Sequence, residues 1–410
     1  MLFFSTRDRD GNTSEISNNP PQTRRDYLIL ATLMLSAATT SIPLMLSGLL
    51  LIDIGETFNT PIGVTGQMRT LSYIISIFFA LITSILSIRY DHKLLLQLGL
   101  ASYILSAIGC NLAPNFSTMI AAFSLTGVGY AFTITMTFTM TRLLSQERRG
   151  EAIGLIIAGS SASYALGALI VPILQNVGGW RVSFFGYMLP ISVLALVLAT
   201  FSIPRQSGGG DSQVRIKIGE AFKTIFSNRS AVFSLLGYLL AMLAFQGVLT
   251  YNTSYFRKSF PISIGEASIL MLINALSYTV GSATAGRTMM RVSRKPLAVV
   301  TILVASAIMM AYSNIPFLLP SAGLVCVLCY LMGTMDASST GLILDQVPMY
   351  VGIMVSFQQV FYLVGSTIGS GVGGALLTYS SFQLMFTALG VFGILSAFVF
   401  QWLTVDSSKS

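Results

Sequence analysis

Three ionisable side chains lie inside or beside long apolar segments of this 410-residue chain, where a charge is costly: Asp336, Arg69 and Asp53. Asp336 lies in the stretch CYLMGTMDASSTG, far enough along its apolar segment to fall in the inner half of a bilayer at about 1.5 Å per helical residue. An acid at such a depth is a candidate for ligand binding or proton transfer. The alternative is a structural carboxyl that accepts hydrogen bonds from the hydroxyls following it or pairs with a loop arginine.

Arg69 belongs to the sequence GQMRT near the outer end of the second apolar segment. A cation there must reach water or find a carboxylate, because the hydrocarbon region solvates it poorly. Asp53 and Glu56, at the end of the first apolar segment, are the nearest acids in sequence. We expect an ion pair that closes the outer end of a helical bundle, and a role in binding or coupling is the alternative.

Uncharged polar side chains within the apolar segments are candidates for the lining of a cavity. A hydroxyl inside a helix can equally bond to a carbonyl of its own helix, so for the threonines both interpretations stand. The amides and tyrosines are larger and carry both donors and acceptors. The candidates chosen by depth and chemistry are Thr39, Thr40, Thr133, Thr137, Tyr164, Gln246, Asn252, Asn274, Gln358 and Tyr362.

The elements that must position these residues are membrane helices. Hydrophobic residues make up 53% of the chain and charged residues 9%, against about a quarter in soluble domains. The strict alternation of a membrane β-barrel is absent, which leaves α-helices as the spanning element. A helix needs about 20 apolar residues to cross the hydrocarbon. Twelve segments qualify: 27–54, 63–86, 94–111, 116–144, 151–175, 182–203, 231–256, 264–288, 297–313, 317–344, 350–378 and 382–405.

The sequence indicates a duplicated six-helix unit. Gly150, Gly167 and Arg89 in the first half recur as Gly352, Gly369 and Arg291 in the second at one common offset. Small residues recur at spacings of three and four in both copies of the glycine-rich helix, a pattern that lets helix backbones approach closely. The first stripe includes Gly154 and Gly150, which maps onto Gly352, and the second includes Gly365, Gly369 and Gly373. We therefore predict an all-α integral membrane protein of two pseudo-symmetric bundles. Its expected parts are a cytoplasmic tail (1–26), a first bundle (27–204), a cytoplasmic linker (205–228) and a second bundle (229–406).

The basic residues are distributed as topology signals. With the amino terminus inside, most of the 23 Lys and Arg fall in the inner segments, as the positive-inside rule describes. This predicts both termini in the cytoplasm and a place in the plasma membrane. It also argues against a nucleic-acid partner, despite the net charge of +8. The basic linker piece VRIKIGEAFKTIF is expected to lie on anionic membrane lipids.

The sequence gives no support for a metal site, a cofactor or an enzyme. Cys326 and Cys329 have CxxC spacing but lie in an apolar segment with no second pair. His92 is the single histidine of the chain. Neither HExxH nor GxxxxGK[ST] occurs, and no span carries a paired acidic motif.

Two segments and the duplication together resemble the major facilitator superfamily. ERRGEAIGL, followed by a Gly, VP and GGWR, resembles its helix-5 antiporter-type signature, and TGQMRT with LSIRYDHK is similar to its helix-2 and loop region. The resemblance covers about residues 27–405 and is nearest to the drug and sugar exporters. It implies two bundles around a central cavity, with a site near the midplane and alternating access by rocking of the halves.

The chain departs from the family pattern at three places. The family's loop aspartate is replaced by Ile88 in the first copy and Met290 in the second, and Phe123 stands about where proton-coupled exporters carry an arginine in helix 4. Proton coupling is therefore left open, with Asp336 as the carboxylate that would carry it. The resemblance makes the inner basic residues candidates for gating: Arg89, Lys93, Arg148, Arg149, Arg291, Arg294 and Lys295.

These observations predict a secondary transporter that exports a small organic solute and works as a monomer. The scarcity of intramembrane charge favours a neutral or amphipathic solute over a phosphorylated one, which would need two or more cations. The alternative is a transporter-like receptor that binds a solute without moving it. Saturable flux would separate a carrier from a channel.

Overall fold

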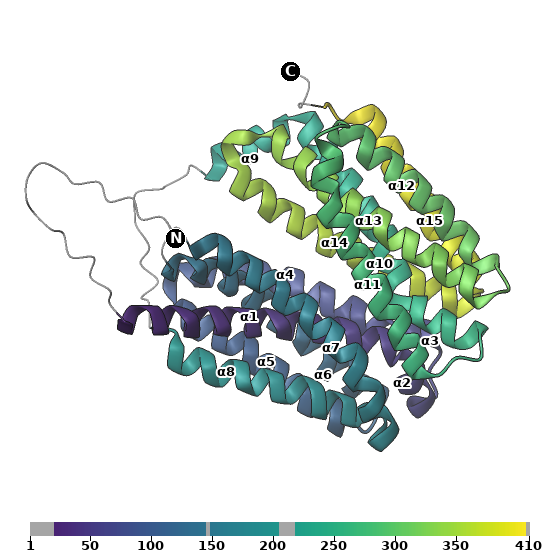
Figure 1. Ribbon diagram of the computed structural model, residues 1–410, viewed down its shortest axis with the longest axis horizontal. Helices are drawn as coiled ribbons and strands as arrows, with labels where there is room; N and C mark the ends of the chain where they lie inside the picture. The colour runs from purple at the N-terminus through teal and green to yellow at the C-terminus, as the bar shows by residue number, and fades with distance from the viewer. Residues whose placement is uncertain (1–19, 145–147, 205–217, 407–410) are drawn as a thin grey trace, which may run out of the picture.

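The computed structural model describes residues 20–144, 148–204 and 218–406, and within those ranges the chain forms helices and turns without strands (Figure 1). The first half comprises α1 (Pro20–Leu49), α2 (Leu51–Phe58), α3 (Ile62–Thr65), α4 (Gln67–Arg89), α5 (His92–Leu112), α6 (Phe116–Thr139), α7 (Arg149–Ser183) and α8 (Leu189–Ser202). The second half comprises α9 (Ile218–Ser227), α10 (Arg229–Ser259), α11 (Ile264–Met289), α12 (Arg294–Ala311), α13 (Leu318–Gln346), α14 (Val351–Tyr379) and α15 (Phe382–Leu403).

The described helices cross a bilayer twelve times, as predicted. Eleven segments are long and apolar enough to span, and the longest of them, Glu151–Ser202, has 52 residues. A straight helix of that length would measure about 78 Å, far more than the roughly 30 Å of hydrocarbon. Gly178 and Gly179 leave helical geometry inside it, and Gly179 has a φ of 75°, which favours glycine. The segment therefore folds back on itself as two crossings, α7 and α8.

The two halves repeat one packing scheme, which confirms the pair of pseudo-symmetric bundles. In the first half α1 packs on α7 and α8, α4 on α6, and α5 on α6 and α8. In the second half α10 packs on α14 and α15, α11 on α13, and α12 on α13 and α15. The predicted linker falls partly outside the described residues, because 205–217 are not described, and so does most of the predicted tail.

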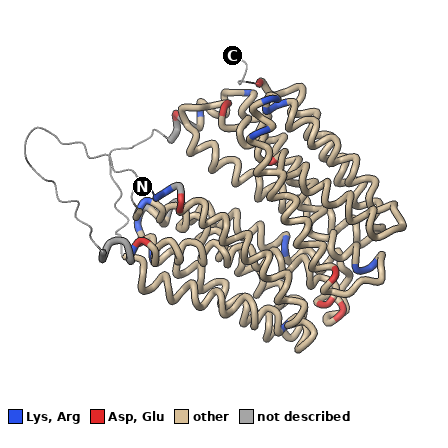
Figure 2. Tube along the Cα trace, in the orientation of Figure 1, with Lys and Arg blue, Asp and Glu red and all other residues tan. Residues whose placement is uncertain are grey.

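We call the end of the molecule that carries Pro20 and Leu403 the inner end and the opposite end the outer end. Lys and Arg gather at the inner end, while the middle of the bundle is almost free of charge (Figure 2). The halves approach at the outer end and diverge toward the inner end (Figure 1). The buried cores agree with this shape, because Ile29, Leu96 and Met136 belong to a core confined to the first half, whereas a second core joins both halves.

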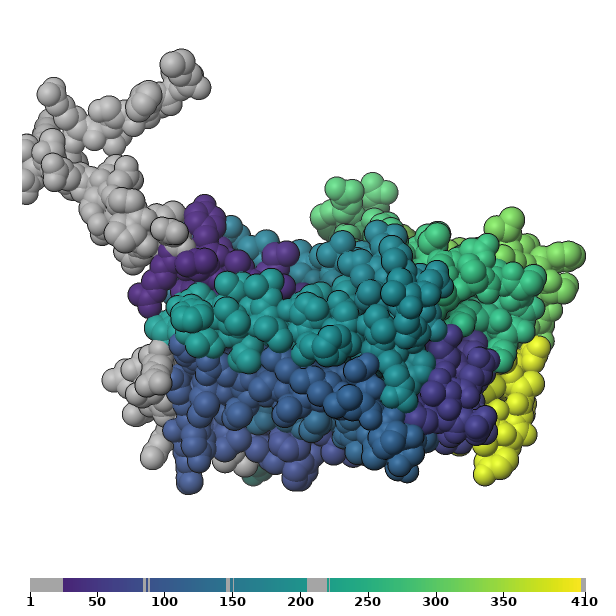
Figure 3. All heavy atoms as spheres, turned by 90° about the horizontal axis from the view of Figure 1, so that it is seen from below, coloured from purple at the N-terminus to yellow at the C-terminus, as the bar shows by residue number. Residues whose placement is uncertain are grey.

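The outer contact is made largely by backbone. A Cβ on Gly63 would lie 2.2 Å from the Gly374 carbonyl oxygen, and one on Gly66 would lie 2.2 Å from the Tyr251 hydroxyl. The Thr70 and Ser370 hydroxyls bond at 2.9 Å across the same seam. Figure 3 shows the purple α2 segment against the second half, coloured green to yellow, at this end. A small residue is thus needed where Gly63 of α3 meets α14.

Small residues also seal helices within each half, although at only some of the predicted positions. Gly369 of α14 packs against α10, where an added Cβ would lie 2.1 Å from the Leu243 carbonyl oxygen. Gly159 of α7 packs against α1 in the same way, and its Cβ would lie 2.3 Å from the Met34 carbonyl oxygen. Gly154 and Gly352, on the predicted stripes, have open space beside them instead. The stripes are wrong at these positions, because both glycines are exposed near the inner ends of their helices and no other described helix packs on them.

Gly369→Ala should destabilise the protein, because its methyl group has no room against the α10 backbone. We expect a loss of about 1–3 kcal/mol, typical of overpacking. Gly352→Ala in the same helix is the matched control and should leave stability unchanged or slightly higher, since alanine favours helix. Thermal melting of the purified variants measures both. Equal melting temperatures for the two variants would contradict the close approach of α10 and α14.

Candidate central cavity

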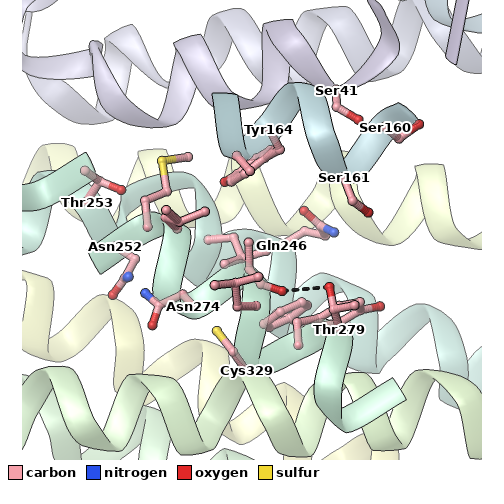
Figure 4. A pocket seen from close by; sticks show the side chains of 18 of the residues that line it. Ser41, Ser160, Ser161, Tyr164, Gln246, Asn252, Thr253, Asn274, Thr279 and Cys329 are labelled. Atoms are coloured by element: carbon pink, nitrogen blue, oxygen red, sulfur yellow. Dashed lines mark hydrogen bonds between the residues drawn. The ribbon is translucent and has the colours of Figure 1, made fainter. Parts of the chain in front are cut away.

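A cavity of about 310 Å³ lies between the two halves (Figure 4). That is within the usual range for small-molecule sites, about 300–1,000 Å³. The first half contributes Ser41 from α1 and Ser160, Ser161, Tyr164 and Ala165 from α7. The second half contributes Phe245, Gln246, Leu249, Asn252, Thr253, Met271, Leu272, Asn274, Ala275, Leu276, Tyr278, Thr279, Cys329 and Tyr362, from α10, α11, α13 and α14.

The polar groups of the cavity come chiefly from α10 and α11. Gln246, Asn252 and Asn274 are nearly buried, with exposed fractions of 9%, 4% and 7%. Gln246 donates to the Tyr362 hydroxyl at 3.0 Å, whereas the Asn252 side-chain oxygen has no hydrogen-bond partner among the described residues. Asn252 and Asn274 lie on the same side of the cavity in Figure 4. A bound solute that donates a hydrogen bond would satisfy the Asn252 oxygen.

Five of the predicted lining residues are brought together here: Tyr164, Gln246, Asn252, Asn274 and Tyr362. Thr39 and Thr40 donate to carbonyls three residues earlier in α1, the local alternative that their chemistry allows. Thr133 and Thr137 are fully buried, with Thr133 against Gly99 of α5, and neither lines the cavity. Gln358 donates to the Thr340 hydroxyl at 2.5 Å and likewise does not line the cavity.

Several lining residues were not predicted, notably Ser41, Thr253 and Tyr278. Tyr278 lies one helical turn after Asn274, so residue spacing on α11 could have identified it. Ser41 and Thr253 carry no such signal, because short hydroxyls are common throughout these helices.

Asp336 lies one side chain behind the cavity wall. Its carboxylate accepts from the Tyr238 hydroxyl at 2.8 Å and from the Tyr278 hydroxyl at 2.6 Å. The predicted partners, the hydroxyls that follow it or a loop arginine, are therefore wrong. In a helix those hydroxyls bond instead to carbonyls of their own turn, as Ser338 and Ser339 do. Because Tyr278 also lines the cavity, it connects the carboxylate to the space between the halves.

The predicted pairing of Arg69 with Asp53 or Glu56 is also wrong. Arg69 donates to the Leu44 carbonyl at 2.6 Å and to the Thr250 hydroxyl of α10 at 3.0 Å. Asp53 lies farther out, on α2, because α1 ends at Leu49 and the chain turns. It pairs with Arg257 of the second half at 2.6 Å, and Gln175 also donates to it. The predicted outer closure exists with a different cation, from the last turn of α10.

The candidate gating residues at the inner end make their contacts within their own half. Arg294 bonds to Asp345, Lys295 donates to the Thr404 carbonyl and Lys93 to that of Thr200. Arg148 lies 3.6 Å from Asp26. The remaining three, Arg89, Arg149 and Arg291, are exposed. These contacts leave the two halves free to separate at the inner end.

Comparison with known proteins agrees with this architecture. The family model of the Major Facilitator Superfamily matches residues 28–260 and 234–410, nearly the whole chain. The chain belongs to this superfamily. An uncharacterized superfamily transporter of Bacillus subtilis, YbcL, is 22% identical over 87% of this chain and 90% of its own length.

Solved structures of superfamily members share the fold at low sequence identity. A bacterial homolog of the human lysosomal transporter Spinster, in an inward-facing and unoccupied conformation, is 16% identical with a TM-score of 0.75, covering 92% of this chain and 96% of its own. A D-xylose–proton symporter is 14% identical with a TM-score of 0.73, covering 94% of this chain and 99% of its own.

Asp53→Asn should loosen the outer closure, because Arg257 would lose its counterion while remaining only 14% exposed. We expect the closed outer end to lose about 1–3 kcal/mol relative to the open one. Spin labels would be attached at the exposed positions Asn176 and Asn314. Double electron–electron resonance should then show an added population with a longer distance between the two labels.

Glu56→Gln is the control, since the Glu56–Lys258 pair is largely exposed and should contribute little. An Asp53→Asn distance distribution identical to the wild type would show that the pair does not hold the outer end closed.

Proposed function

We propose that this superfamily member is a secondary transporter that exports a small organic solute across the plasma membrane by alternating access. The observation that carries the proposal is the central cavity, to which both halves contribute and which lies between a joined outer end and a divergent inner end. A solute bound there contacts both halves. Its passage requires the halves to separate at one end and meet at the other.

The lining supports a solute with an apolar body and a few polar groups. Phe245, Leu249 and Met271 provide apolar contact, while amides and tyrosine hydroxyls provide donors and acceptors at fixed places. No Lys or Arg lines the cavity among the described residues, so a multiply charged solute is disfavoured. Export, the cytoplasmic position of both termini and a functional monomer are inferred from the exporter-type signature and the basic inner end.

Reconstituted protein should show saturable uptake and counterflow of one member of a panel of radiolabelled sugars, nucleosides, lipophilic amines and amphipathic carboxylates. Asn252→Ala should raise the half-saturating concentration about tenfold, because one buried hydrogen bond to the solute is worth about 1–1.5 kcal/mol. Asn314→Ala, at an exposed outer position, is the control. Binding without counterflow would favour the receptor alternative and contradict transport.

Proton coupling through Asp336 is the finer part of the proposal. Its support is the bond to Tyr278, through which protonation of the carboxylate could alter the cavity wall. Asp336→Asn should abolish accumulation driven by an imposed pH gradient in vesicles while solute counterflow without a gradient persists. The pair of assays separates coupling from translocation. Unchanged gradient-driven accumulation in the variant would remove Asp336 from the mechanism.

A further inference from the structure

A second, smaller chamber adjoins the central cavity inside the first half. It has a volume of about 30 Å³, enough for about two waters or one carboxylate group. Its walls come from α1, α4, α5 and α6, and Tyr362 of α14 completes it. Tyr362 also lines the central cavity, so its side chain belongs to the walls of both spaces.

The chamber is rich in unused hydrogen-bond donors. The Tyr73 and Tyr103 hydroxyls are buried and have no partner among the described residues. The Tyr130 and Tyr362 hydroxyls each accept from a glutamine, Gln359 and Gln246, and no acceptor for their own protons is found among the described residues. The other wall hydroxyls are already satisfied, as in the Ser72–Thr126 bond of 2.8 Å.

Arg69 places a positive charge beside this chamber, bonded to one of its wall residues. Arg69, Tyr73 and Ser76 lie on one face of α4 at spacings of four and three residues. Its guanidinium donates to the carbonyl of Leu44, a chamber residue, while its Nε has no partner among the described residues and the side chain is only 5% exposed. No carboxylate among the described residues lies within ion-pair distance of it. A buried cation without a counterion is costly and calls for an anion.

We propose that this chamber binds the carboxylate of the transported solute, which is an amphipathic monoanion. The inference rests on the proposed transport function and narrows its substrate class. The apolar body of the solute would occupy the central cavity against Phe245 and Met271, and the carboxylate would pass Tyr362 to meet Arg69 and the tyrosine hydroxyls. A single cation matches a monoanion, whereas a phosphate monoester would remain undercompensated.

The assignment is tested by binding to purified full-length protein in detergent. The probes are radiolabelled 3-phenylpropionate and octanoate, each paired with its uncharged amide, which keeps the apolar body and removes the charge. Wild-type protein should bind a carboxylate at least about tenfold more tightly than its amide, because charge-assisted hydrogen bonds are about twice as strong as neutral ones.

Three variants locate this preference. Arg69→Gln should abolish it, and Tyr73→Phe should weaken carboxylate binding about fivefold without changing amide binding. Tyr312→Phe is the matched control: its hydroxyl is also buried and unpartnered but belongs to the second half, outside the chamber, and both probes should bind it as they bind wild type. Tyr73→Phe keeps the ring and the charge, so it tests the proposal even where Arg69→Gln fails to fold.

Equal affinity of wild type for carboxylate and amide overturns the proposal, as does an equal loss for both probes in Tyr73→Phe. Chloride is the alternative anion that Arg69 and the tyrosine hydroxyls of the chamber would bind. If it raises the melting temperature of wild type and not of Arg69→Gln, with no preference for either carboxylate, the solute assignment is overturned. Counterflow in vesicles distinguishes the two proposals. A carboxylate preference without counterflow supports carboxylate binding in the chamber and contradicts transport. Counterflow without a carboxylate preference contradicts only the binding proposal.

Discussion

The structure depends on a close contact between two backbones at the outer end. Gly63 of the first half meets the Gly374 backbone of the second with no room for a Cβ, and the Tyr251 hydroxyl lies against Gly66 beside it. Larger residues there would hold the halves apart and expose the space between them from both ends. Since packing rather than the hydrophobic effect holds helices together in a bilayer, this contact determines which end of the molecule is closed. The Asp53–Arg257 pair then fixes the closed arrangement electrostatically.

The same low-dielectric surroundings explain where the polar side chains lie. Most helix hydroxyls bond to carbonyls of their own turn and need no cavity, as Thr39 and Ser339 do. The larger amides and tyrosines within the bundle and the two deeply placed charges depend more on partners from other helices, as Gln246 and Asp336 do. Several of them are found at the central cavity, at its Tyr238–Asp336–Tyr278 wall and in the chamber beside Arg69. The helices that line these spaces therefore carry recognition: α1, α4, α5, α6, α7, α10, α11, α13 and α14.

Much of the fold could be predicted because a bilayer imposes length and composition on each crossing. The twelve crossings, the duplication and five cavity residues follow from hydropathy, internal repetition and side-chain chemistry. The ion-pair partners do not, because Asp53 and Arg257 are distant in sequence and meet only through the packing of the halves. Thr133 and Thr137 failed as cavity candidates for a related reason. Depth in the membrane is readable from sequence, but the direction in which a helix face points depends on its neighbours.

Covalent closure of the outer seam tests the account most directly. Thr70 and Ser370, whose hydroxyls bond across the halves, would be replaced by cysteines after the native Cys110, Cys326 and Cys329 are changed to alanine. The two thiols should form a disulfide readily, since the side chains already touch. If the halves must part at this end during transport, oxidation stops solute counterflow and reduction restores it. Counterflow that continues in the fully cross-linked protein would contradict alternating access about the central cavity.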